Sequence, residues 1–288
     1  MSSVLRRRVM RVEQLTDAAR PALERLVDAD PLVNVVLAAR LRQVSTIERA
    51  SFGGELLGVW DADRELVAAV LSAGNVLPIG DDPEAWQLLG ANLATTPRAC
   101  TSIVGRAGAV AEIWRCIGSA WGPARAIREA QPLLVADRST VLPPGDARVR
   151  RIRPSELDQY LPAAAAMFTE ELGVSPYRQA SIAAYRRRVG GLINEGRAFG
   201  IVDRDGDVIF KADLGAVSRN TCQVQGVWVR PDERGKGIGT RALAAVFRHA
   251  LALTPTVSLY VNDFNLAARK IYGRLGMHEA ATLSTILF

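Results

Sequence analysis

The 288-residue chain has too few cysteines and histidines to form the sites that these residues usually build. Its three cysteines, Cys100, Cys116 and Cys222, are odd in number and scattered, and there are only two histidines. A disulfide framework needs paired cysteines, and a zinc site needs closely spaced Cys or His ligands. We therefore expect no metal, and we expect buried, reduced thiols of the kind found in the cytoplasm.

Long apolar runs are also missing. Arg248, His249 and Pro255 interrupt the longest candidate, so no segment is predicted to span a membrane. The amino terminus, MSSVLRRRVMRVEQL, carries arginines but no apolar core, and we expect no signal peptide. A composition of 49% hydrophobic and 23% charged residues indicates a globular protein with one large domain or two ordinary ones.

Lysine is nearly absent, since Lys211, Lys236 and Lys270 are the only three, yet arginine brings the net charge to +6. Such a charge is compatible with nucleic acid, an anionic membrane surface or a small anionic ligand. The basic residues are dispersed, however, and neither a zinc finger nor an aromatic RNA-binding motif accompanies them. Nucleic acid is therefore a weakly supported partner.

One stretch, Val224–Leu243, has the pattern of an anion-binding site. Residues 221–229 alternate and are rich in β-branched and aromatic side chains, which predicts a strand. Residues 230–239 hold three glycines at alternate positions, and apolar residues recur at helical spacing from Thr240 onward. Free N–H groups at a helix start favour a phosphate, and glycines let the ligand approach the backbone.

The spacing excludes two common phosphate motifs. Gly235-Lys236-Gly237 does not supply a P-loop, and the G-x-G-x-G spacing with no acid near 255–258 differs from a dinucleotide fold. The stretch instead resembles the acyl-CoA-binding motif of the GNAT superfamily of N-acetyltransferases, V-x-V, then P-x-x-[RQ]-G-x-G-[IV]-[GA], then a helical leucine. Every position is filled, by Val227, Val229, Pro231, Arg234, Gly235, Gly237, Ile238, Gly239 and Leu243.

A second resemblance follows in residues 258–276. Asn265, Ala268 and Tyr272, followed by Leu-Gly, are similar to the N-x-x-A-x-x-x-Y helix of the same family. Asn265 and Tyr272 are seven residues apart, so they are expected on one helix face. The resemblance implies that Asn265 binds the pantetheine arm and that Tyr272 protonates the departing CoA thiolate. For Tyr272 the alternative is a core aromatic residue with a satisfied hydroxyl.

The resemblance further implies an acetyl-CoA site and direct transfer of the acetyl group to a primary amine. The Val229 N–H would polarise the thioester carbonyl, and the glycine loop would hold the CoA. The CoA-binding residues that it implies are Val227, Trp228, Val229, Arg234, Gly235, Lys236, Gly237, Ile238, Gly239, Thr240, Asn265 and Tyr272.

The motif does not identify the group that deprotonates the amine. Many relatives carry a carboxylate on the strand before the glycine loop, where this chain has Gln223 and Gln225, which cannot take a proton. Glu170 and Glu171 are the nearest candidates, and because adjacent helical residues diverge by about 100°, at most one would face the cleft. A solvated position for each, or an amine that arrives already neutral, stays open.

The order of predicted elements divides the chain in two. Leu142-Pro-Pro-Gly-Asp146 predicts a boundary. Residues 147–288 predict β-α-α-β-β-β-α-β-α-β, the order of a complete GNAT domain, and residues 1–143 echo that order. We therefore expect an α/β fold with mixed sheets (α+β), a tandem GNAT-like arrangement in which helices flank a central, mostly antiparallel twisted sheet in each half.

Three local expectations belong to the second half. Pro162 should kink or restart its first helix. Residues 177–194 predict a second helix, and residues 282–288 predict the last strand of this half.

The two halves differ where the glycine loop should be. The first half has Gly80-Asp-Asp-Pro-Glu84, whose three carboxylates would repel a pyrophosphate. We therefore expect a degenerate domain at 1–143 that does not bind CoA and an N-acetyltransferase domain at 147–288. The acceptor would be a primary amine on a small molecule, peptide or protein. The alternative is a non-catalytic acyl-CoA-binding regulatory or scaffold protein.

Overall fold

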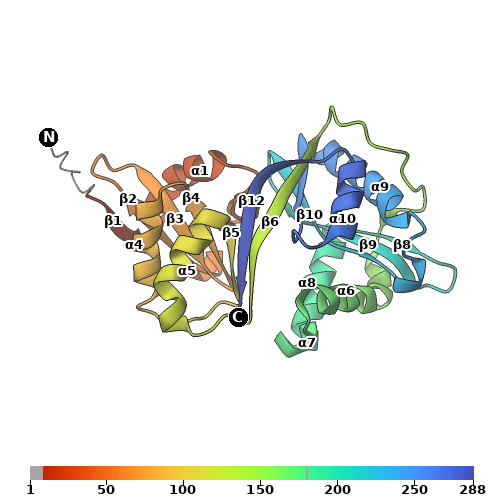
Figure 1. The fold of residues 1–288 in the computed structure, drawn as a ribbon, viewed down its shortest axis with the longest axis horizontal. Helices are drawn as coiled ribbons and strands as arrows, with labels where there is room; N and C mark the ends of the chain where they lie inside the picture. Colours follow the sequence, from red (N-terminus) through yellow and green to blue (C-terminus); the bar gives the residue numbers. More distant parts are fainter. Residues whose placement is uncertain (1–8, 180) are drawn as a thin grey trace. The chain divides into compact units, whose positions relative to one another are not determined.

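A computed structural model describes residues 9–179 and 181–288, and the chain forms two compact units (Figure 1). The first unit runs to Leu133 and also includes Ala280–Phe288, and the second unit is Leu134–Glu279. The signal-peptide expectation rests on the amino terminus, of which residues 1–8 lie outside the described residues.

The first unit has a mixed sheet in which β1 to β4 are antiparallel neighbours, β4 and β5 are parallel, and β12 is antiparallel to β5. Its elements are β1 (Arg11–Gln14), η1 (Asp17–Ala19), α1 (Arg20–Asp28), α2 (Val35–Leu41), α3 (Arg49–Phe52), β2 (Glu55–Trp60), β3 (Leu66–Ser72), β4 (Asn75–Gly80), α4 (Pro83–Leu93), β5 (Ser102–Arg106), α5 (Ala107–Trp121), the first part of β6 (Ala126–Asp137) and β12 (His278–Leu287).

Both faces of this first sheet are buried because successive side chains of a strand point to opposite faces. In β3, Ala68 and Val70 pack in the core with α4 and α5, whereas Ala69 and Leu71 pack in the core with α1 to α3. The continuous apolar sequence of β3 follows from helices covering both faces (Figure 1).

The second unit repeats this plan, with β7 to β10 antiparallel and β10 parallel to β11. Its elements are the last part of β6, β7 (Arg150–Arg151), η2 (Pro154–Glu156), α6 (Leu157–Leu172), α7 (Pro176–Gln179), α8 (Ile182–Asn194), β8 (Ala198–Val202), β9 (Val208–Val217), β10 (Thr221–Val229), η3 (Pro231–Glu233), α9 (Ile238–Leu253), β11 (Thr256–Tyr260) and α10 (Leu266–Arg274).

Two cores flank the sheet of the second unit. Helix α9 contributes a stripe of apolar residues at helical spacing to one core, and Tyr272 of α10 joins it. Helices α6 and α8 pack in the other core through Tyr160, Tyr185 and Val189. The equivalent order of strands and helices in the two units confirms the expected repeat.

The division between the units differs from the expected limits of 1–143 and 147–288. Strand β12 was expected in the second half, but its residues Leu283–Leu287 pair with Ser102–Arg106 of β5, in the first unit. Strand β6 in turn contributes residues from 134 onward to the second unit, beside β11. The last strand of the second half therefore lies mostly in the first unit, and the last strand of the first half is divided between the two units.

The Pro-Gly segment expected as the linker is packed on the second unit. Arg248 of α9 donates to the carbonyl of Pro143 at 2.6 Å, and the Asp146 N–H donates to the Arg241 carbonyl at 3.0 Å. Prolines and glycine mark irregular backbone here, but that backbone is held by hydrogen bonds to a helix and does not separate two domains.

Of the two outcomes expected at Pro162, a kink or a restart, the restart does not occur, because helix α6 continues through this residue. The second helix expected in this half is corrected. The helix expected over 177–194 is divided into α7 and α8, because Ser181 caps α8 by accepting from the Ala184 N–H.

Within residues 9–179 and 181–288, no helix combines the length and apolar character needed to span a membrane.

Candidate functional site

The expected glycine loop connects η3 to α9. Gly235 and Gly237 have φ of 79° and 74°, the left-handed region that glycine adopts without strain. Gly237 is the N-cap of α9, and no described side chain caps this helix end. The first N–H groups of α9 are therefore left for an anion, as the motif predicts.

Gly239 explains why the start of α9 lies so close to its neighbours. A Cβ on Gly239 would lie 3.1 Å from Cδ1 of Ile271 on α10 and 3.6 Å from Cγ2 of Val229 on β10. A larger residue would push the helix away from both elements. Gly239, the third glycine of the motif, thus allows close packing, whereas Gly235 and Gly237 allow a left-handed backbone.

Strand β10 carries a bulge before it reaches the glycine loop. Gln225 is opposite Asp213 and Trp228 is opposite Lys211, so β10 has one extra residue here, and Gly226 has φ of 61°. A glycine in the left-handed region at a bulge bends the strand and increases its twist. Pairing between β10 and the parallel β11 ends at Gln223, so the second half of β10 has no ladder partner on that side.

The end of β10 is fixed to the glycine loop by Arg234. Its Nε donates to the Val229 carbonyl at 2.9 Å, and its Nη2 pairs with Glu170 at 2.7 Å. Trp228 Nε1 also donates to Glu170, at 3.0 Å. Glu170, one of the two carboxylates expected as a base, therefore has one oxygen bound by Trp228 and the other by Arg234.

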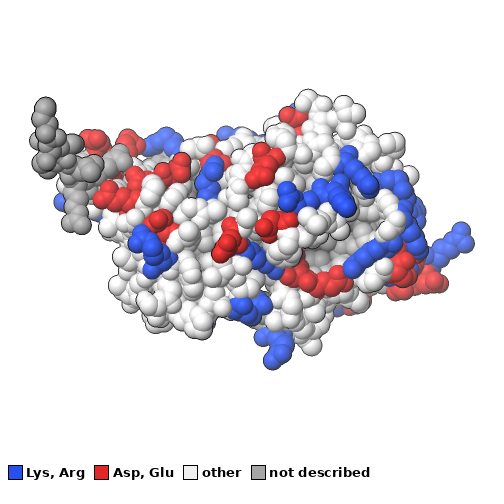
Figure 2. Space-filling view, viewed as in Figure 1, with Lys and Arg blue, Asp and Glu red and all other residues white. Residues whose placement is uncertain are grey.

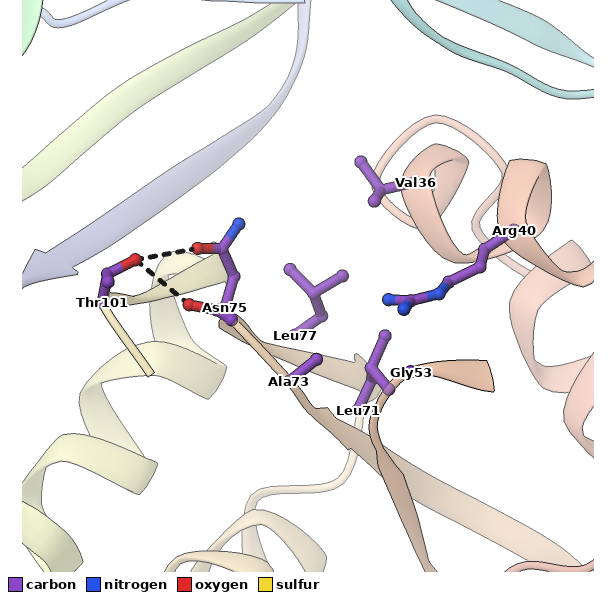
Figure 3. A pocket seen from close by; sticks show the side chains of 9 residues that line it. Val36, Arg40, Gly53, Leu71, Ala73, Asn75, Leu77 and Thr101 are labelled. Carbon is purple, nitrogen blue, oxygen red and sulfur yellow. Dashed lines mark hydrogen bonds between the residues drawn. The ribbon is translucent and has the colours of Figure 1, made fainter. Parts of the chain in front are cut away.

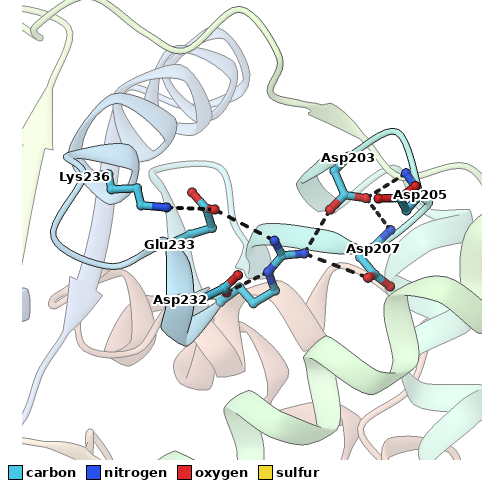
Figure 4. A network of polar contacts seen from close by, with 7 residues as sticks. Asp203, Asp205, Asp207, Asp232, Glu233 and Lys236 are labelled. Atoms are coloured by element: carbon cyan, nitrogen blue, oxygen red, sulfur yellow. Dashed lines mark hydrogen bonds and ion pairs between the residues drawn. The ribbon is translucent and has the colours of Figure 1, made fainter.

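An ion-pair network supports the segment before the loop (Figure 4). Arg230 donates to Asp203 at 2.9 Å and to Asp232 at 2.8 Å, and these bonds raise the pKa of Arg230. Lys236 of the glycine loop pairs with Glu233 at 3.0 Å. Surface pairs of this kind stabilise little singly, but this network joins η3 to the hairpin between β8 and β9.

Basic side chains gather over this part of the second unit. Figure 2 shows Lys and Arg side chains concentrated where Figure 1 places α9 and α10. Arg234, Lys236 and Arg241 come from the loop and the first turn of α9, and Arg269 and Lys270 come from α10. This local positive charge favours a polyanionic ligand such as CoA.

Tyr272 lies in the core beside α9, with 6% of its surface exposed. Its hydroxyl makes no hydrogen bond to any residue that the structure describes, and it is not among their fully buried polar atoms without a partner. Burial, and then the negative charge of Glu171, raises the pKa of Tyr272. The phenol therefore stays protonated and can act as a proton donor.

Asn265 has a structural role that the sequence did not show. Its side-chain oxygen accepts from the Ala268 N–H at 3.1 Å, so it is the N-cap of α10 and precedes the helix. The expectation that Asn265 shares a helix face with Tyr272 is thus replaced by a capping position. Of the other residues implied in CoA binding, Val227 and Trp228 are part of the β10 bulge region, and Ile238 and Thr240 belong to the first turn of α9.

A buried polar network lies under the bulge. Lys211 Nζ pairs with Asp213 at 2.7 Å and donates to the Gly226 carbonyl at 2.8 Å, and the Tyr160 hydroxyl donates to Asp213 at 2.7 Å. The Lys211 side chain is fully buried. Motif reasoning missed this network; only the unusual sequence Phe-Lys-Ala-Asp-Leu, with charges on one face of a buried strand, could have indicated it.

Replacing Lys211 with methionine is expected to lower the free energy of unfolding by about 3–5 kcal/mol, because it leaves Asp213 buried without its counter-charge. Urea unfolding measures this loss. The double variant Lys211→Met/Asp213→Asn should recover much of it, since no unpaired buried charge remains. A single variant that loses less than about 1 kcal/mol would mean that the pair does not hold the bulge.

Two family models match parts of this chain. Residues 191–277 match the model of the Acetyltransferase (GNAT) family, and residues 54–160 match a Domain of unknown function (DUF4081). No curated protein matches the chain.

Solved structures share the fold over nearly the whole chain. An acetyltransferase from the GNAT family of Colwellia psychrerythraea is 15% identical with a TM-score of 0.59, covering 96% of this chain and 99% of that one. A GCN5-related N-acetyltransferase from Sphaerobacter thermophilus is 20% identical with a TM-score of 0.59, covering 96% and 95%. A tandem GNAT protein from the clavulanic acid biosynthesis pathway is 15% identical with a TM-score of 0.58, covering 97% and 98%. These likenesses confirm the tandem GNAT fold.

Proposed function

Because residues 191–277 form a domain of the GNAT acetyltransferase family, we propose that the chain transfers an acetyl group from acetyl-CoA to a primary amine by direct attack. One observation carries the proposal: the uncapped start of α9, at a left-handed glycine loop, belongs to the same core as Tyr272, whose hydroxyl has no described partner. This reaction requires the protein to bind the CoA phosphates and to donate a proton, and these two features supply both functions.

Each part of the site has a role in this reaction. Acetyl-CoA supplies the activated acetyl group as a thioester. The N–H groups at the start of α9 and the basic side chains around them hold the pyrophosphate. The end of β10, freed from β11 by the bulge, offers the Val229 N–H to the thioester carbonyl. Tyr272 donates a proton to the sulfur as the carbon–sulfur bond breaks and the carbon–nitrogen bond forms.

For the base, we favour Glu171 over Glu170. Both carboxylate oxygens of Glu170 are already bound, one by Trp228 and the other by Arg234. Glu171 acts electrostatically on Tyr272, which places it near the proposed acid. An amine that arrives already neutral would need no base, and this route stays open.

We propose that the first unit does not bind CoA. Asp82 caps α4 by accepting from the Ala85 N–H at 3.0 Å, so a carboxylate of the chain already occupies the helix start. A Cβ on Gly80 would lie 2.6 Å from the Val67 carbonyl, so a glycine is needed here for two strands to approach closely.

We also propose a cytoplasmic setting, with which three free cysteines are compatible.

The direct test is release of the CoA thiol when the full-length chain is mixed with acetyl-CoA and a panel of amines. We expect thiol release that depends on the amine, with N-acetylated product found by mass spectrometry. A reaction without amine controls for hydrolysis. If calorimetry shows saturable acetyl-CoA binding and no amine of a small-molecule, peptide or protein panel is acetylated, the chain is a non-catalytic acyl-CoA-binding protein.

A further inference from the structure

The first unit contains a pocket of about 340 Å³ that the proposed reaction does not use (Figure 3). Arg40 of α2 lines one side of it, the apolar side chains of Leu71 and Leu77 form its floor, and Asn75 and Thr101 lie on the other side. This volume is in the range of small-molecule sites. The pocket lies at the turn between β3 and β4, at the opposite end of β4 from Gly80.

Arg40 is a half-buried cation without an anionic partner. No carboxylate or carbonyl of the described residues binds its guanidinium, which lies over the ring of Phe52 at 5.0 Å and against the backbone of Gly53. Burial lowers the pKa of Arg40, and no neighbouring acid offsets this effect. Five other half-buried arginines do have a carboxylate partner, and these are Arg20, Arg106, Arg150, Arg197 and Arg230.

The opposite side of the pocket also offers donors. The side-chain oxygen of Asn75 accepts from the Ser102 hydroxyl at 2.9 Å and faces the Thr101 hydroxyl at 3.5 Å. The amide nitrogen of Asn75 points away from the Thr101 hydroxyl (Figure 3) and remains a donor. Neither Asp nor Glu is among the described residues that line the pocket.

We propose that this pocket binds a small organic carboxylate with an apolar body. A guanidinium matches the two oxygens of a carboxylate in a bidentate arrangement. The partial desolvation of Arg40 makes a bound anion more favourable than it would be at an exposed arginine. The apolar floor of Leu71 and Leu77 covers the body of such a ligand, whereas a phosphate would bring more charge than one arginine balances.

The test is titration of the full-length chain by calorimetry with hexanoate, phenylacetate and N-acetyl-leucine. At least one carboxylate should bind saturably with a Kd of about 1 mM or tighter, which is reasonable for a ligand of this size. Hexanamide, which has the same apolar body without the charge, should bind at least tenfold more weakly than hexanoate.

Matched variants place the ligand at this pocket. Arg40→Gln should weaken carboxylate binding at least tenfold, and Arg40→Lys should weaken it less because the charge remains. Arg42→Gln, a loss of the same charge at the end of the same helix, should leave binding unchanged, as should Gly237→Asp in the glycine loop of the second unit. Without ligand, Arg40→Gln should melt within about 2 °C of the natural chain, because it removes a cation that pairs with no carboxylate of the described residues.

Two results would overturn the proposal. One is the absence of saturable binding by every carboxylate up to about 10 mM. The other is equal binding by Arg40→Gln and the natural chain, which would place any carboxylate site elsewhere. Neither result depends on acetyl transfer, so this proposal and the proposed function can fail separately.

Discussion

Replacing Tyr272 with phenylalanine is expected to lower the turnover number of the proposed reaction by about 10²–10⁴-fold and to change acetyl-CoA affinity little. The phenyl ring keeps its place in the core with α9, and only the hydroxyl is lost. That hydroxyl makes no hydrogen bond to a described residue, so the variant should unfold at nearly the same urea concentration as the natural chain.

Steady-state kinetics with the acceptor found in the amine panel measures the effect of Tyr272→Phe. Tyr185→Phe is the matched control, since it removes a hydroxyl from another buried tyrosine, on α8, and should leave turnover nearly unchanged. Full turnover in Tyr272→Phe would show that another group protonates the thiolate.

The pH dependence gives a second measurement on Tyr272. Its pKa is raised above the ordinary value of 10.0 by burial and by the charge of Glu171, so the phenol keeps its proton at and above pH 10. A raised pKa preserves the acid form, and we therefore expect no alkaline loss of turnover between pH 7 and 10 from this group. Glu171→Gln removes one of the two causes, so the alkaline limb should move to lower pH.

The glycine loop could be predicted because the residues that define it are close together in the sequence. Gly235, Gly237 and Gly239 are set by backbone conformation and close packing within one strand–loop–helix segment, and these constraints act on neighbouring residues. The repeat of element order could also be predicted, since hydrophobic periodicity is local as well. The role proposed for Tyr272 came from the family resemblance together with the glycine loop, whereas its place in the core with α9 is known from the structure.

The parts that could not be predicted depend on partners distant in sequence. The pattern of residues 282–288 indicates a strand but not which strand it pairs with, and pairing with β5 moves it to the other unit. Similarly, Glu170 and Glu171 are equivalent in the sequence. In the structure Glu170 binds Arg234, 64 residues away, and Trp228, 58 residues away, and neither partner is adjacent to it in the sequence.

The Lys211 network was harder still to predict from the sequence. It brings together α6, β9 and β10 through Tyr160, Asp213 and Gly226, and no short motif includes all of them. A buried lysine in a strand is unfavourable unless it is paired, so its partners have to be found in three dimensions. The network lies at the bulge in the β9–β10 ladder, in the part of β10 that no longer pairs with β11, and it therefore contributes to the shape of the proposed site.

Replacing Gly237 with aspartate is expected to weaken CoA binding by at least about 100-fold while the second unit stays folded. Gly237 is the N-cap of α9, so the new carboxylate would occupy the helix start where the pyrophosphate is proposed to bind. A Cβ at this position would lie 3.0 Å from Nη1 of Arg241, so the carboxylate would also pair with a cation otherwise available to the phosphate.

The fold of Gly237→Asp should survive because aspartate is a favourable N-cap residue and tolerates a positive φ better than most residues. Gly237→Asn is the matched control, since it has nearly the same size and the same tolerance of φ at 74° but no charge. Calorimetry with CoA should rank the affinities as natural chain, then Asn, then Asp, and thermal melting should show all three folded. If the aspartate variant binds CoA with natural affinity, the phosphate groups bind elsewhere in the chain.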